Sequence, residues 1–117
     1  EDALTPRELR TVVYFGLNSA DLTSTAEALL QRRAREANEV ELIEVVVTGN
    51  TATAGDRSYN QRLSARRAAV VREALVRYGI DASKVRVVAL GETNLARETA
   101  DGVREPLNRR TEVQFDF

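Results

Sequence analysis

The 117-residue sequence contains no cysteine, histidine, methionine or tryptophan. Without cysteine it can form no disulfide, no catalytic thiolate and no zinc–thiolate centre. Without histidine it lacks the commonest general base and the commonest ligand of transition metals. These absences argue against an enzyme, and we expect neither a metal nor a cofactor. Because the chain begins at Glu1 and holds no methionine, we expect it to be a processed or excised piece of a longer protein.

An excess of charge of one sign is also lacking. The 17 basic and 18 acidic residues give a net charge of -1, and Lys84 is the one lysine. A nucleic-acid-binding protein usually gathers excess positive charge on one face, so the composition does not support a nucleic-acid partner. No apolar run approaches the roughly 20 residues that a helix needs to cross a bilayer. We therefore expect no direct insertion of this chain into a membrane.

What is present is the composition of a folded domain. The chain is 43% hydrophobic and 30% charged, and its length fits one domain with its own core. We predict a lead-in segment over residues 1–10 and a single domain over 11–117. Hydrophobic periodicity predicts strands at 11–15, 42–48, 85–90 and 109–117, and helices at 23–38 and 59–78.

Local signals mark the ends of these elements. Ser24 and Glu27 have the spacing of a capping box at the start of the first helix. Gly79 follows the second helix and tolerates the left-handed conformation of a helix C-terminus. We predict a loop of small and polar residues at 49–58 and a long polar connection at 91–108, a length that is more often functional than idle.

The order of elements is β-α-β-α-β-β. Strands that alternate with helices imply right-handed crossovers, which place both helices on the same face of a mixed sheet. The sequence therefore predicts an α/β (α+β) two-layer sandwich.

The second predicted helix carries two polar residues on its apolar face. On a helical wheel of about 100° per residue, Asn60 and Arg67 lie within about 60° of Leu63. A buried arginine must find anions or hydrogen-bond acceptors, because an unpaired buried charge costs several kcal/mol, about 3 to 5. One interpretation is a structural arginine that caps the carbonyl ends of neighbouring strands or pairs with a core carboxylate. The other is a guanidinium aimed at a ligand carboxylate. Geometry alone favours the structural one.

Motifs along almost the whole chain add a family resemblance. The helix pattern resembles that of the OmpA-like C-terminal domain, the peptidoglycan-associating module also found in Pal and MotB-type proteins. The residues that carry the helix pattern are Asn60, Leu63, Ser64, Arg67, Ala68, Val71 and Leu75. Further matches are Phe15-x-x-Asn18-Ser19, Thr48-Gly49-Asn50-Thr51, Tyr78-Gly79-Ile80, Gly91-Glu92 and Asn108-Arg109-Arg110-x-Glu112-Val113.

This resemblance implies non-catalytic binding of peptidoglycan in the periplasm. Such domains hold the diaminopimelate residue of the stem peptide and tether a parent outer-membrane protein or lipoprotein, whose other regions lie outside this chain. A zwitterionic ligand centre needs an anion for its ammonium and a cation for its carboxylate. By position, Arg67 takes the carboxylate, and Arg109 or Arg110 supplies a second positive contact. Hydrogen bonds are assigned to Asn18, Thr51 and Asn60.

One position departs from the family pattern. The aspartate expected after the second strand is replaced by Ala52, so the ligand ammonium loses its charge partner. Asp56 or Glu92 could substitute for it. The alternatives are a degenerate domain that lost peptidoglycan binding and serves as a structural or protein-interaction module, or an engineered Ala52. An enzyme is a more distant alternative.

Overall fold

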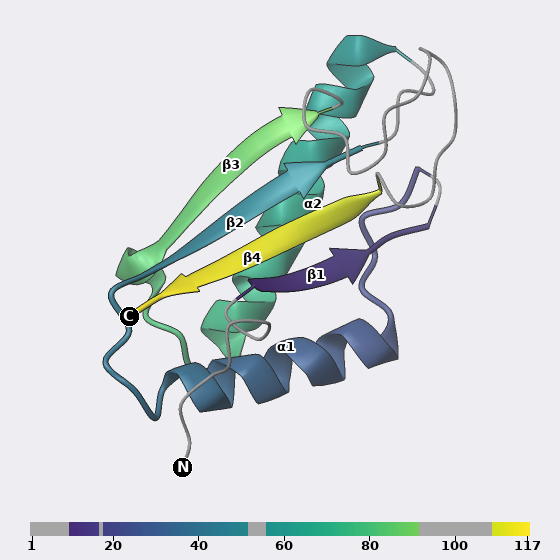
Figure 1. Ribbon diagram of the computed structural model, residues 1–117. Helices are drawn as coiled ribbons and strands as arrows, with labels where there is room; N and C mark the ends of the chain where they lie inside the picture. The colour runs from purple at the N-terminus through teal and green to yellow at the C-terminus, as the bar shows by residue number, and fades with distance from the viewer. Residues whose placement is uncertain (1–9, 17, 52–55, 92–108) are drawn as a thin grey trace.

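The computed structural model describes residues 10–16, 18–51, 56–91 and 109–117. Figure 1 shows the elements in these residues, and their order confirms the predicted β-α-β-α-β-β pattern. A short 3-10 helix is added before the third strand. The elements are β1 (Arg10–Tyr14), α1 (Ser24–Ala37), β2 (Glu44–Asn50), α2 (Arg57–Arg77), η1 (Ala82–Lys84), β3 (Val85–Gly91) and β4 (Arg110–Asp116).

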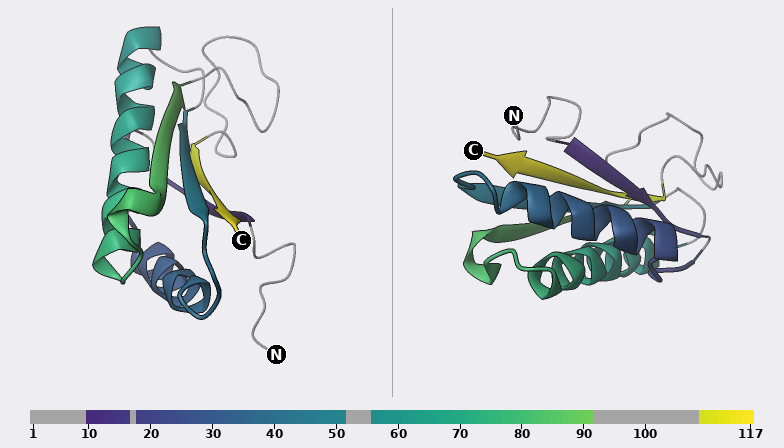
Figure 2. Two further views of the ribbon diagram at one scale, coloured as in Figure 1. Left: turned by 90° about the vertical axis from the view of Figure 1, so that its left-hand side faces the viewer. Right: turned by 90° about the horizontal axis from the view of Figure 1, so that it is seen from below.

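The four strands form one mixed sheet in the order β1-β4-β2-β3. β2 pairs parallel with β3, whereas β4 runs antiparallel between β1 and β2. Both helices lie on the same face of this sheet (Figure 2), which confirms the predicted two-layer sandwich. The ends of β1, β2 and β3 and the beginning of β4 meet at one end of the sheet (Figure 1).

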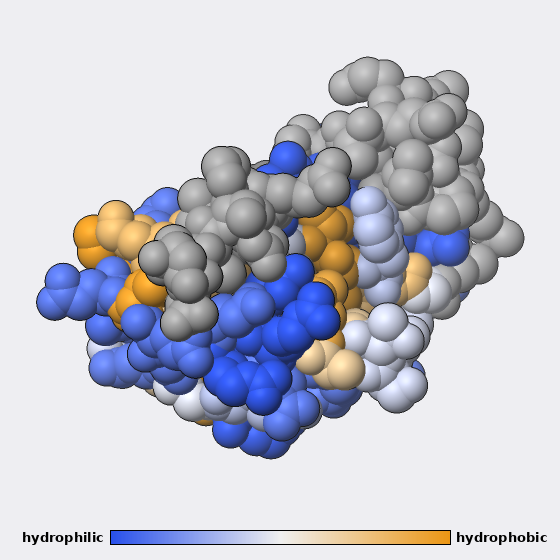
Figure 3. Space-filling view, turned by 60° about the horizontal axis from the view of Figure 1, so that its bottom comes forward, coloured by the Kyte–Doolittle hydropathy of each residue, from blue (hydrophilic) through white to orange (hydrophobic). Residues whose placement is uncertain are grey.

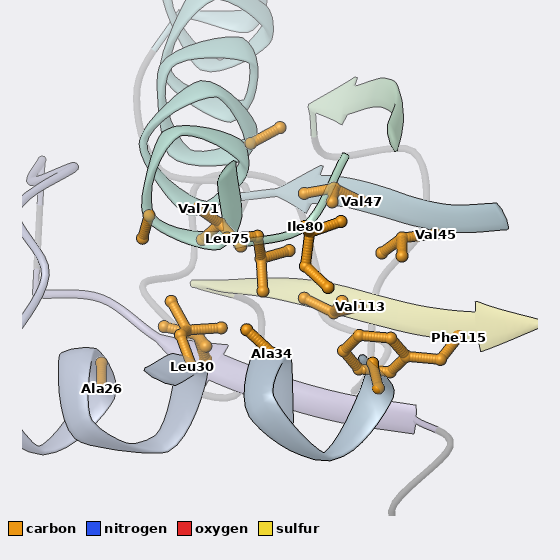
Figure 4. Packing of buried hydrophobic residues seen from close by; sticks show 14 of the residues in the cluster. Ala26, Leu30, Ala34, Val45, Val47, Val71, Leu75, Ile80, Val113 and Phe115 are labelled. Atoms are coloured by element: carbon orange, nitrogen blue, oxygen red, sulfur yellow. The ribbon is translucent and has the colours of Figure 1, made fainter. Parts of the chain in front are cut away.

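The core lies between the helices and the sheet, as Figure 4 shows. On the strands, alternate residues of one face point into it, because side chains in a strand alternate between the two faces. On the helices, the buried residues follow helical spacing. The core includes Leu30 and Ala34 of α1, Val45 and Val47 of β2, Val71 and Leu75 of α2, and Val113 and Phe115 of β4. The face of α1 that points away from the core is turned forward in Figure 3, and it is largely hydrophilic.

The start of α1 differs from the prediction. Thr23 is the N-cap, with extended backbone angles (φ -73°, ψ 162°), and its hydroxyl accepts a hydrogen bond from the Ala26 N–H at 3.0 Å. The predicted capping box of Ser24 and Glu27 is therefore wrong by one position. Glu27 instead accepts hydrogen bonds from the Tyr78 hydroxyl at 2.7 Å and from Arg77 at 3.0 Å, which joins α1 to the end of α2.

The predicted loop at 49–58 is too long at both ends. Gly49 and Asn50 still pair with β3, and α2 begins at Arg57 after an N-cap at Asp56. The C-terminus of α2 is as predicted: Gly79 has φ 111°. Its N–H donates to Val76 O, and the Ile80 N–H donates to Leu75 O, both at 3.0 Å. This pair of bonds is a Schellman motif, which satisfies the last carbonyls of the helix.

The polar residues expected in the apolar stripe of α2 are buried. Asn60 is 2% exposed and Arg67 is 0% exposed, whereas Arg62, Arg66, Glu73 and Arg77 lie on the exposed side. Of the predicted connection at 91–108, Gly91 belongs to β3 and the rest lies outside the described residues. Within the described ranges, neither helix combines the length and the apolar character needed to cross a membrane.

Candidate functional site: a buried arginine where the strands end

Arg67 joins the segment after β1 to the end of β2. Its Nε donates a hydrogen bond to Ser19 O at 2.8 Å, and its Nη2 donates to Gly16 O at 3.0 Å. Its Nη1 donates to Asn50 O at 3.0 Å. Each nitrogen of the guanidinium therefore holds a backbone carbonyl, and the side chain has no exposed surface. This is a structural arrangement of the kind that geometry favoured, although the carbonyls belong to the segment after β1 and to the end of β2, two strands that β4 separates in the sheet.

A glycine in β2 brings α2 close enough for this contact. A Cβ at Gly49 would lie 2.0 Å from Ser64 O and 3.2 Å from Ala68 Cβ, so any side chain there would collide with α2. Glycine permits this close approach of a helix backbone to a strand. Since Arg67 lies between Ser64 and Ala68 on α2, the approach places its side chain at the end of the sheet.

The charge of Arg67 is costly to bury, and its neighbours increase the cost. Burial, followed by the nearby guanidinium of Arg109, lowers the pKa of Arg67 to about 10; Tyr59 acts in the opposite direction. The residue still carries its charge at pH 7, because that pKa remains well above 7. The guanidinium also lies over the Phe15 ring, 5.2 Å from its centroid. Arg109 donates its Nε to Phe15 O at 3.1 Å, so both arginines contact Phe15.

The other residues predicted for the site are only partly gathered around Arg67. Thr51, 1% exposed, follows the carbonyl that Arg67 holds, and Asn60 is buried on the same face of α2. Asn18 is exposed and has φ 56°, in the left-handed region that asparagine tolerates. Arg109 is half-buried. Ala52 and Glu92 lie outside the described residues.

Two predicted residues lie elsewhere. Arg110 donates its Nε to Glu112 Oε2 at 2.6 Å, on the face of β4 opposite the core, so Arg109 is the terminal arginine beside Arg67. Asp56 is exposed, and its Oδ2 accepts from Ser58 Oγ at 2.6 Å and from the Tyr59 N–H at 3.1 Å. Those bonds, Ser58 first, lower the pKa of Asp56. It would have to give up its capping role to serve as the missing carboxylate.

Two buried acceptors lie beside Arg67 at the end of β2, and the sequence assigned a hydrogen-bonding role to Thr51 but none to Asn50. Asn50 Oδ1 and Thr51 Oγ1 are buried, and neither has a hydrogen-bond partner among the residues that the structure describes. The amide orientation of Asn50 is fixed because its Nδ2 donates to Thr48 O at 3.2 Å. The position of Asn50 in the Thr48-Gly49-Asn50-Thr51 motif was the signal that could have identified it. Across the part of the chain that the structure describes, no cluster of three or more histidine, cysteine or acidic side chains could bind a metal.

Comparison with known proteins gives consistent matches. The chain is 34% identical to the peptidoglycan-associated lipoprotein of Haemophilus influenzae over 103 residues, which cover 88% of this chain and 67% of that protein. It is 33% identical to outer membrane protein A of Bordetella avium, covering 87% of this chain but 53% of the relative. The chain thus spans about half the length of that relative.

Solved structures show the same fold. The crystal structure of the peptidoglycan-associated lipoprotein from Burkholderia pseudomallei has a TM-score of 0.81 at 28% identity, with 90% of this chain and 89% of that chain covered. The C-terminal domain of Helicobacter pylori MotB has a TM-score of 0.79 at 19% identity, covering 92% of this chain and 86% of that chain, which is a likeness of fold alone. A family model matches residues 14–109, more than half of the sequence. The chain therefore belongs to the OmpA family.

Proposed function

We propose that this domain binds the diaminopimelate residue of peptidoglycan stem peptides without catalysing a reaction. In the periplasm it would hold a parent outer-membrane protein or lipoprotein to the cell wall. The observation that carries this proposal is the pair of guanidinium groups at the end of the sheet, Arg67 and Arg109, in a family whose relatives include peptidoglycan-associated lipoproteins. A stem peptide carries carboxylates, which guanidinium groups bind well.

The burial of the site residues suggests how they divide this work. Arg109 and Asn18 have exposed surface and can contact a ligand directly. Thr51, Asn60 and Arg67 are buried, so in this proposal they maintain the shape of the site. The charge of Arg67 still acts on a nearby carboxylate, because a charge is screened less in a buried setting than in water.

A second candidate function has its own supporting observation. All three nitrogens of Arg67 already hold backbone carbonyls, and Ala52 stands where the family has an aspartate. A domain that kept the fold and lost the ligand would have these features. It would then serve as a structural or protein-interaction module of the parent protein.

Sedimentation with purified peptidoglycan sacculi, together with Ala52→Asp, separates the two candidates. We expect the unmodified domain to sediment with sacculi and to bind diaminopimelate in a calorimetric titration. We expect Ala52→Asp to change the affinity by less than about threefold, because another carboxylate already receives the ammonium. Ala52→Asn is the control for side-chain size without charge. A domain that stays in the supernatant and binds diaminopimelate only as Ala52→Asp would establish the second candidate.

A further inference from the structure

A groove of about 470 Å³ lies beside the buried arginine, on the outer side of α2. Residues 18–21, which follow β1, form one wall, and Arg66, Ala69 and Val70 of α2 form the other. The wall formed by residues 18–21 is fixed by Arg67, because Ser19 O accepts a hydrogen bond from Arg67 Nε at 2.8 Å. Asn18, a residue that the sequence predicted for the ligand site, is one of the residues that line this groove.

The two charged residues of the groove have opposite signs and do not neutralise each other. Asp21 and Arg66 form no ion pair within the described residues, and both are exposed. The one hydrogen bond of Asp21 within the described residues is made by its backbone N–H, which donates to Ser19 Oγ at 3.0 Å, and its carboxylate has no ion pair there. Arg66 lies over the Tyr59 ring, 5.9 Å from its centroid, a contact that leaves its N–H donors available. Groups of opposite charge on the walls of one groove suit a ligand that carries both charges.

The remaining lining fits the rest of such a ligand. Ala69 and Val70 give the α2 wall an apolar surface between the polar groups, which suits the aliphatic chain of an amino acid. Asn18 contributes an amide that can donate and accept hydrogen bonds. An amino-acid centre needs one anion for its ammonium and one cation for its carboxylate.

We propose that this groove binds the zwitterionic end of an amino acid, with the ammonium against Asp21 and the carboxylate against Arg66. The inference rests on the proposed function, since the free end of diaminopimelate is such a centre. In this proposal Asp21 is the anion for the ligand ammonium, the role that the family pattern gives to the aspartate replaced by Ala52. Asp21 rather than Asp56 takes this role, because the Asp56 carboxylate caps α2.

Calorimetric titration with diaminopimelate tests this assignment. We expect Asp21→Asn and Arg66→Gln each to weaken binding about threefold to tenfold, and the double variant by at least tenfold, as for contacts between partly solvated charges. Arg62→Gln is the matched control: Arg62 is an exposed arginine one turn away on α2 that does not line the groove, and it should change the affinity less than twofold. Thermal unfolding of each variant checks that the fold is retained.

A modified ligand distinguishes direct contact from an indirect effect. Diaminopimelate with its amino groups acetylated carries no ammonium, so the loss caused by Asp21→Asn should disappear with it, while the loss caused by Arg66→Gln should persist. If the domain binds diaminopimelate and neither substitution weakens it, the groove assignment is wrong and the proposed function stands. If the unmodified domain binds neither diaminopimelate nor sacculi, both are wrong.

Discussion

Replacement of Arg67 by alanine should lower the free energy of unfolding by about 3 to 5 kcal/mol. The substitution removes the donors that hold the carbonyls of Gly16, Ser19 and Asn50. A buried acceptor left without a donor costs about 1 to 3 kcal/mol, and water entering the space offsets part of the sum. Urea unfolding followed by circular dichroism measures the change.

Two further variants make this result specific. Arg67→Lys keeps a charge but not the planar fork, so it should recover only part of the lost stability. Arg66→Ala changes the neighbouring exposed arginine and should stay within about 0.5 kcal/mol of the unmodified protein. If Arg67→Ala were no more destabilising than Arg66→Ala, the three carbonyl contacts would contribute nothing to the fold.

The second large effect is expected at the contact between β2 and α2. Gly49→Ala would place a Cβ 2.0 Å from Ser64 O and 2.9 Å from the Ser64 carbonyl carbon. Both are backbone atoms of a helix, so the collision cannot be relieved by turning a side chain. Overpacking of a close contact typically costs 1 to 3 kcal/mol, and we expect about 3 or more here because the whole helix must move.

Gly16→Ala is the matched control for this substitution. The nearest atom to a Cβ at Gly16 is Ser19 Cβ at 3.8 Å, an ordinary contact. Its effect on the urea midpoint should be small, within about 1 kcal/mol of the unmodified protein. Equal effects of the two glycine substitutions would mean that α2 does not need its close approach to β2.

The fold could be predicted from the sequence because its signals are local. Hydrophobic periodicity located each strand and helix to within a few residues, and Gly79 marked the end of α2. The misplaced polar residues Asn60 and Arg67 also stood out, since a periodic apolar stripe makes an exception visible. The N-cap of α1 was misassigned because Thr23, Ser24 and Thr25 all carry hydroxyls that can cap a helix.

The contacts of the site could not be predicted in the same way. The carbonyls held by Arg67 belong to residues 17, 48 and 51 positions away in the chain, and no local pattern relates them. Asp21 and Arg66 each look like an ordinary surface charge in the sequence. Only the packing of the segment after β1 against α2 places them along one groove.

Titration of the isotope-labelled domain with diaminopimelate, followed by amide chemical shifts, would locate the bound ligand on the domain. We propose that Arg67 maintains the site, that Asp21 and Arg66 receive the zwitterionic end of the ligand, and that the exposed Asn18 and the half-buried Arg109 also contact it. We predict the largest shifts at residues 18–21, 66–70 and 109, with smaller changes at the buried Asn50 and Thr51. The opposite pattern, with the largest shifts at Asn50 and Thr51 and an unchanged groove, would show that the groove does not bind the ligand.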